Sequence, residues 1–339
     1  MIVDRYYYSQ LNKQEQAIYK AFYNGVMAHQ DIIPIPIKGM LSQTAFTKIY
    51  QAVTRDNPLI YLLNQSACNF AQDIFGHTAI CPQYFYDANT IKKYNRKIEE
   101  VVNGLAGKLQ LTEGSDYDKA LKIHDWLCQN VQYDFQGADL NNPARVISSH
   151  NIIGVFAQRK AQCEGIAKAV KVLMNAVDLK CIVATGTTIK DGKSDYHAWN
   201  VVNINGKPYH MDVTWDIGQF LGNNKRIPYD YFNINDALIS KTHKAEDKLP
   251  ACVSLEANYF TKNRLVFKSK IQLLTYMKYK SQKGTKEFYI RLGENLSPSD
   301  ISQEIIQIVS KAMLERGNGS MAKTQMINEE IGTYWLKIH

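Results

Sequence analysis

The sequence predicts an α+β fold whose central part places helices first and an antiparallel sheet after them. Apolar side chains recur at helical spacing from Asp118 to Val131 and again from about Cys163 to Val177. Three strand-like runs follow, and Asn205-Gly206 separates the last two, which is the strongest short-range signal for a β-hairpin. Helices grouped before strands are typical of α+β folds. The three runs are 181–185, 198–204 and 209–215.

Residues 1–115 are predicted to form a mainly helical N-terminal region. Asn12-Lys13-Gln14-Glu15 resembles a capping box that starts a first helix. The run Ile33-Pro34-Ile35-Pro36-Ile37 indicates an edge strand or an extended segment, because proline cannot donate to a central ladder. Further helices are expected over 42–53 and 88–105.

A polar stretch at 111–116 predicts the boundary to a core that spans 116–250. Residues 255–339 are predicted to form a small α+β unit, with strands at 264–267, 288–291 and 333–338 and a helix beginning near Pro298. A chain of 339 residues exceeds what one hydrophobic core usually serves, so two or three packed regions are expected.

Composition excludes several protein classes. With 45% hydrophobic and 21% charged residues, the chain is neither disordered, collagenous nor a coiled coil. No apolar stretch approaches the ~20 residues of a transmembrane helix. Six cysteines without a CxxC pair favour a reducing compartment. We therefore expect a cytoplasmic protein, with an exported protein whose leader was removed as the open alternative.

Metal-ligand patterns are weak in this sequence. His124 and Cys128 lie four residues apart on a predicted helix, but no further ligands lie near them in sequence. No calcium-loop pattern is present either. We expect neither a metal nor another cofactor.

Cys163 is the first candidate for chemistry. It lies immediately ahead of an amphipathic helix, where unpaired backbone N–H groups and the helix dipole favour a thiolate. A buried, inert cysteine is the competing interpretation of this position alone.

His197 and Asp212 strengthen the case for Cys163. If Asn205-Gly206 forms a two-residue loop, His197 and Asp212 project to the same face as diagonal neighbours, ~7–8 Å apart at the backbone. A histidine oriented by an aspartate is the arrangement that activates a thiol. A three-residue loop would break this parity. His210 shares the face of Asp212 and is a rival that we expect to be structural.

These residues occur in a pattern that resembles the bacterial transglutaminase-like superfamily. The resemblance covers about 117–245 and rests on segments in the family's order. The segments are Ile123-His124-Asp125-Trp126-Leu127, Tyr133-Asp134, 149–155, Cys163-Glu164-Gly165, 196–200, 209–216, 229–233 and His243.

The resemblance implies a papain-like core, with Cys163 as nucleophile, His197 as general base and then acid, and Asp212 as the residue that orients the imidazole. It implies a cysteine-dependent acyl-transfer enzyme that attacks amide bonds of a protein, peptide or cell-wall peptide through a thioester. Hydrolysis and transamidation both stay open. The backbone N–H of Cys163 should be one oxyanion donor.

Two alternatives to an active enzyme remain. The family includes catalytically dead relatives, so the chain could be a binding protein with an unused triad. The segment Lys262–Arg291 holds nine Lys and Arg against a single acid, Glu287, which could contact an anionic polymer or surface. A solvated lysine-rich face is the simpler interpretation of this segment. Nucleic acid is not expected, since no recognition motif accompanies the charge.

Overall fold

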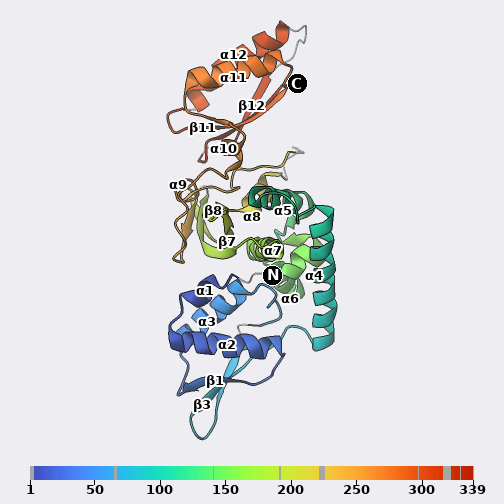
Figure 1. Cartoon of the computed structure of the whole chain (residues 1–339), viewed down its shortest axis with the longest axis vertical. Coiled ribbons are helices and arrows are strands. Elements are labelled where there is room, and N and C mark those ends of the chain that lie inside the picture. The colour runs from blue at the N-terminus through green and yellow to red at the C-terminus, as the bar shows by residue number, and fades with distance from the viewer. Residues whose placement is uncertain are drawn as a thin grey trace.

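The computed structural model describes residues 4–64, 67–139, 141–190, 192–220, 226–296, 298–315, 322–328 and 330–338. Figure 1 shows three tiers along the long axis: the N-terminal elements, the central sheet with its helices, and the C-terminal helices and strands. The predicted α+β class is confirmed, because helices pack on antiparallel sheets in separate segments of the chain. No helix in the described part of the chain combines the length and apolar character that a membrane crossing needs.

The N-terminal tier combines helices with a three-stranded sheet of order β1-β3-β2. The predicted capping box is present, since Asn12 and Glu15 each bond the other's backbone N–H. The proline-interrupted run forms an edge strand, as predicted. The elements of this tier are α1 (Tyr6–Ser9), α2 (Lys13–Met27), β1 (Ile33–Lys38), α3 (Gln43–Asp56), β2 (Asn69–Gln72) and β3 (His77–Cys81). Helix α4 (Ala88–Lys108) follows and runs alongside the helices of the central tier (Figure 1).

The central tier is a four-stranded antiparallel sheet of order β8-β7-β6-β9, with α7 (Cys163–Ala176) packed on β6 and β7. Its strands are β6 (Cys181–Lys190), β7 (Lys193–Ile204), β8 (Lys207–Met211) and β9 (His243–Ala245). The predicted two-residue hairpin is confirmed: Ile204 pairs with Lys207 across the turn. Asn205 and Gly206 both have positive φ, 51° and 80°, the backbone that this tight turn requires.

The predicted strand at 209–215 is wrong beyond Met211. The chain turns at Asp212 and forms helix α8 (Val213–Phe220) instead. The Asp212 carboxylate accepts a hydrogen bond from the backbone N–H of Trp215, so the side chain caps the new helix. An alternating pattern of apolar residues was therefore overridden by a local capping interaction.

The remaining central elements surround this sheet. Helix α5 carries the segment that leads into the core, and a short parallel pair, β4 and β5, precedes α7. These elements are α5 (Asp116–Asn130), β4 (Gln132–Tyr133), α6 (Pro143–Ser149), the π-helix η2 (Gly154–Gln158), β5 (Lys160–Ala161), α9 (Asp236–Ile239) and α10 (Tyr259–Lys262).

The C-terminal tier is a four-stranded sheet of order β10-β11-β13-β12 covered by two helices. The three predicted strands and the helix near Pro298 are confirmed, whereas α11 and β12 were not predicted. Helix α11 was missed because its sequence has little apolar stripe. The elements are β10 (Val266–Phe267), α11 (Lys270–Gln282), β11 (Glu287–Leu292), α12 (Pro298–Leu314), β12 (Ala322–Asn328) and β13 (Thr333–Ile338).

In the described part of the chain, the largest cluster of buried apolar side chains runs from Tyr7 to Ala257, and the next largest runs from Phe267 to Tyr334. The first cluster crosses residue 115, because α4 packs against α7 and η2 of the central tier. The domain boundaries at 115 and 250–255 stay predictions.

Candidate active site

Cys163 is the first residue of α7 and is 8% exposed. Its approach is fixed by the backbone: the N–H of Gln162 donates to the carbonyl of Ser149 at 2.9 Å. Gly165 allows this close approach, because a Cβ there would lie 2.5 Å from the Ser149 carbonyl oxygen. The thiol is thus held at the N-terminus of α7.

Asp134 organises the loop ahead of the nucleophile. Its carboxylate accepts hydrogen bonds from two guanidinium nitrogens of Arg145 and from Ser149 Oγ. The bond from Arg145 holds the pKa of Asp134 at about 2, although burial opposes this. Gln162 donates its Nε2 to the backbone carbonyl of Asp134 at 3.3 Å. The side chain next to the nucleophile is therefore tied to the same loop.

His197 lies on β7 and Asp212 directly after β8, and the two side chains meet. His197 Nε2 is 2.6 Å from Asp212 Oδ2, and both residues are buried. Residue 212 has left the strand, yet the register of the hairpin still brings its carboxylate to the histidine. The structure thus brings together the side chains that the sequence singled out, while their catalytic roles stay a prediction.

The charges of this pair reinforce each other. Burial alone would lower the pKa of His197, but the Asp212 carboxylate and a hydrogen bond with Cys163 raise it to about 10. Burial would likewise raise the pKa of Asp212, but His197 and the bonds to it hold that pKa well below its usual range. At neutral pH the pair is an imidazolium facing a carboxylate. Since Nε2 is bonded to Asp212, Nδ1 is the nitrogen left available to Cys163.

Two tryptophans pack on the His197 ring. Trp199 lies nearly parallel to it, with ring centroids 6.3 Å apart, and Trp215 meets it edge-on at 6.2 Å. Trp199 is buried, and its Nε1 donates to His210 Nδ1 at 3.0 Å. His210 in turn contacts Asp236 at 2.9 Å rather than Asp212. His210 is therefore a structural histidine, as expected.

Sequence reasoning missed the role of His243. It was placed in the closing segment of the family resemblance without a function, yet its Nε2 lies 2.9 Å from Asp212 Oδ2. Asp212 therefore contacts two imidazoles with one oxygen. Local pattern could not reveal this contact, because β9 reaches the site only through its pairing with β6.

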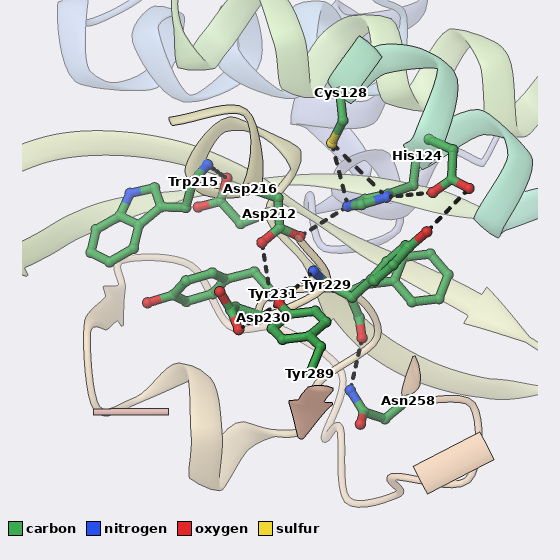
Figure 2. A network of polar contacts seen from close by, with 12 residues as sticks. His124, Cys128, Asp212, Trp215, Asp216, Tyr229, Asp230, Tyr231, Asn258 and Tyr289 are labelled. Carbon is green, nitrogen blue, oxygen red and sulfur yellow. Dashed lines mark hydrogen bonds and ion pairs between the residues drawn. The ribbon is translucent and has the colours of Figure 1, made fainter. Parts of the chain in front are cut away.

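Beneath the site, a buried polar network holds α8 in place (Figure 2). His124 Nε2 lies 2.9 Å from Asp216 Oδ2, and Cys128 Sγ is 3.7 Å from the same nitrogen. Asp216 Oδ1 accepts the backbone N–H of Tyr231 at 3.2 Å. The His124 and Cys128 pair therefore joins α5 to the helix that Asp212 caps.

Among the residues that the structure describes, two groups of side chains have ligand atoms close enough for a metal ion: His197, Asp212 and His243, and separately His210, Asp236 and Cys252. In both groups the imidazole nitrogens lie 2.6–2.9 Å from a carboxylate oxygen. At that distance the nitrogen and oxygen share a proton directly and leave no room for an ion between them. Both groups fit hydrogen-bonded pairs better than metal sites.

Residues 103–213 match the sequence model of the transglutaminase-like superfamily. The chain carries a transglutaminase-like core. The match includes Cys163, His197 and Asp212 and ends one residue beyond the aspartate. The predicted resemblance is thereby confirmed at the level of the superfamily.

Relatives of this transglutaminase-like core are distant. The chain is 22% identical to the kyphoscoliosis peptidase of Mus musculus over 163 residues, which is 44% of this chain and 24% of that protein. A crystal structure described as a TGase is 17% identical, with a TM-score of 0.31, and the match covers 57% of this chain and 52% of that one. A protein proposed to be a cysteine protease, from Cytophaga hutchinsonii, is 18% identical at a TM-score of 0.28, covering 41% and 51%. The chain thus spans about a quarter of the curated relative and half of these structures.

The basic segment Lys262–Arg291 is partly structural. Arg291 is buried, and its guanidinium donates to Asn258 Oδ1 and to the Asp230 carbonyl. Phe267, Phe288 and Tyr289 are buried as well. The lysines of α11 and its flanks are mostly exposed, and Lys270 pairs with Glu304. What remains of the predicted patch is a lysine-rich face.

Proposed function

We propose that this protein is a cysteine-dependent acyl-transfer enzyme that acts on amide bonds of a protein or peptide. The observation that carries the proposal is the buried His197–Asp212 pair, which interacts electrostatically with Cys163 at the start of α7. An ion pair of thiolate and imidazolium is the activated form of a cysteine nucleophile.

The reaction follows from these positions. The Cys163 thiolate adds to the amide carbonyl carbon, and the imidazolium of His197 gives its proton to the leaving amine as the C–N bond breaks. An acyl thioester remains on Cys163. Water or a second amine then attacks the thioester while His197 takes a proton from it, and the thiolate is regenerated. Asp212 keeps the imidazole oriented and stabilises its charge.

The proposal is tested by the alkylation rate of Cys163 against pH, with iodoacetamide and peptide mass spectrometry. Cys68 and Cys81 are internal controls, because both are more exposed than Cys163. An activated Cys163 reacts faster than either below pH 8 despite its burial. A Cys163 that stays slower than Cys68 at every pH contradicts the proposal.

Hydrolysis and transamidation are separated by a second assay. Glutamine-containing peptides are incubated with and without a primary amine, and the Cys163→Ser variant serves as the inactive control. Incorporated amine identifies a transferase, while cleavage or deamidation in water identifies a hydrolase.

The second candidate is a binding protein with an unused triad, which the burial of Cys163 and the exposed lysines near α11 would favour. It predicts wild-type function in the Cys163→Ser variant. Binding to an anionic polymer that weakens steeply with salt would assign the lysine-rich face to that role.

A further inference from the structure

The carboxylate of Asp212 is shared between two histidines. Its Oδ2 lies 2.6 Å from His197 Nε2 and 2.9 Å from His243 Nε2, and its Oδ1 accepts the N–H of Trp215 at 3.1 Å. Asp212 is 1% exposed. Since the carboxylate is withdrawn from water, its orientation depends on these protein donors.

The ionised carboxylate of Asp212 can only accept a hydrogen bond, so the Nε2 of His243 carries the proton of the bond between them. His243 Nδ1 lies 2.7 Å from Thr242 Oγ1, and Tyr231 Oη lies 3.3 Å from the same hydroxyl. Asn328 Nδ2 donates to Tyr231 Oη at 3.1 Å. The Thr242 hydroxyl, which also lies 3.5 Å from the Ile239 carbonyl oxygen, can accept from Tyr231 and donate to Nδ1 at the shorter distance. With Thr242 donating to Nδ1, His243 is neutral and its proton lies on Nε2, where it is donated to Asp212.

The charges around His243 agree with a neutral ring. Burial lowers the pKa of His243, and the nearby positive charge of His197 lowers it further, against the opposing effect of Asp212. The titratable groups that face the ring are Asp212, His197, His210 and Tyr231. Only one of the two imidazoles beside Asp212 is thus charged at neutral pH.

The ring of His243 is held rigidly. It lies on β9, and its residue pairs with Thr188 of β6. Trp215, Trp199 and Tyr231 surround it, with ring centroids 4.8, 5.2 and 5.5 Å away. A donor fixed in this way holds its acceptor in one orientation.

We propose that His243 is a positioning residue, which in its neutral form with the proton on Nε2 holds the Asp212 carboxylate toward His197. The proposal rests on the proposed function, since it assigns His243 to the support of the Cys163–His197 pair. His243 acts through Asp212 and does not touch the reacting atoms.

Two substitutions distinguish this role from simple packing. His243→Phe keeps a ring among the aromatic neighbours but removes the donor, while His243→Gln removes the ring but keeps an amide donor. We expect His243→Phe to raise the apparent pKa of Cys163 alkylation by about one unit, roughly tenfold in rate below that pKa, the effect of one hydrogen bond to a charged group. His243→Gln should recover part of the shift. The proposal is overturned if the alkylation profile of His243→Phe equals that of the wild type. It is also overturned if His243→Phe lies closer to the wild type than His243→Gln does.

A matched control is available in the same sheet. His210→Phe removes the same kind of imidazole–carboxylate contact, but from Asp236. Its alkylation profile should stay at wild type even if the protein is less stable. If His243→Phe does not fold, Thr242→Val replaces it, because this change removes the hydroxyl that fixes the tautomer. An unshifted profile for Thr242→Val then overturns the proposal.

A measurement on the wild-type protein separates this inference from the proposed function. The ¹⁵N chemical shifts of the histidine rings report protonation directly, whatever the reactivity of Cys163. We expect His243 neutral with its proton on Nε2 and His197 doubly protonated at pH 7. A charged His243, or a proton on Nδ1, refutes the positioning role, whereas an unreactive Cys163 beside a neutral His243 refutes only the enzyme.

Discussion

The Asp212→Asn variant tests the electrostatics of the site most directly. The change keeps the size of the side chain and removes its charge, which lies 2.6 Å from His197 Nε2. The pKa of His197 stands at about 10, against 6.5 for an ordinary histidine. Without the carboxylate, burial is the dominant remaining effect and lowers that pKa, so the imidazole becomes neutral at pH 7.

The expected magnitude follows from the loss of the imidazolium. A thiol without its ion-pair partner titrates near ~8.5, so at pH 6.5 only about one in a hundred is ionised. Alkylation of Cys163 in Asp212→Asn should therefore fall by up to about a hundredfold at pH 6.5 and approach the wild-type rate above pH 9.

The assay is iodoacetamide labelling of Cys163 over pH 5.5–9.5, with Cys68 as the internal reference and circular dichroism as the check on folding. Asp236→Asn is the matched control, because Asp236 makes the corresponding bond to His210. An Asp212→Asn profile that overlays wild type, in a folded protein, would refute the reasoning about the ion pair.

Three further predictions concern stability and binding. Gly165→Ala should destabilise the protein by about 1–3 kcal/mol and slow Cys163 alkylation, since its Cβ would meet the Ser149 carbonyl; thermal melting and labelling measure both. Because the pKa of Asp134 is lowered to about 2 in the folded protein, its ionised carboxylate adds to the free energy of unfolding above pH ~3.9, and this stabilisation is lost as the pH falls toward 2. In urea titrations across that pH interval, the free energy of unfolding should therefore fall less in Asp134→Asn than in the wild-type protein. Replacing Lys278 and Lys283 by Gln should weaken binding to heparin columns at low salt and leave Cys163 labelling unchanged; equal retention would exclude the lysine-rich face as a polyanion site.

Much of the central fold could be predicted because its signals are local. The turn residues Asn205 and Gly206 fix the register of β7 and β8, and that register brings His197 to Asp212. The helix that begins at Cys163 follows from a regular apolar stripe. Each of these signals lies within about ten residues of the element that it specifies.

The strand predicted too long and the missed contact of His243 both depend on interactions that the local sequence pattern does not reveal. The strand predicted through Trp215 ends at Met211, because Asp212 caps a helix while it also binds two histidines. The second of these, His243, arrives from 31 residues further along the chain. Contacts of this kind depend on strand pairing across the sheet, which spacing along the chain does not determine.

The docking of the C-terminal tier bears on how this protein can be shortened. Tyr289 donates its hydroxyl to Asp230 at 3.0 Å (Figure 2), and Arg291 donates to the Asp230 carbonyl. The neighbouring Tyr231 carbonyl accepts the backbone N–H of Asp212 at 3.1 Å. A chain cut near residue 255 would lose both contacts that β11 makes with Asp230. Asp230 is the neighbour of Tyr231, whose carbonyl holds the backbone of Asp212. Loss of activity in such a truncated protein would therefore report a loosened scaffold rather than a missing substrate-binding module.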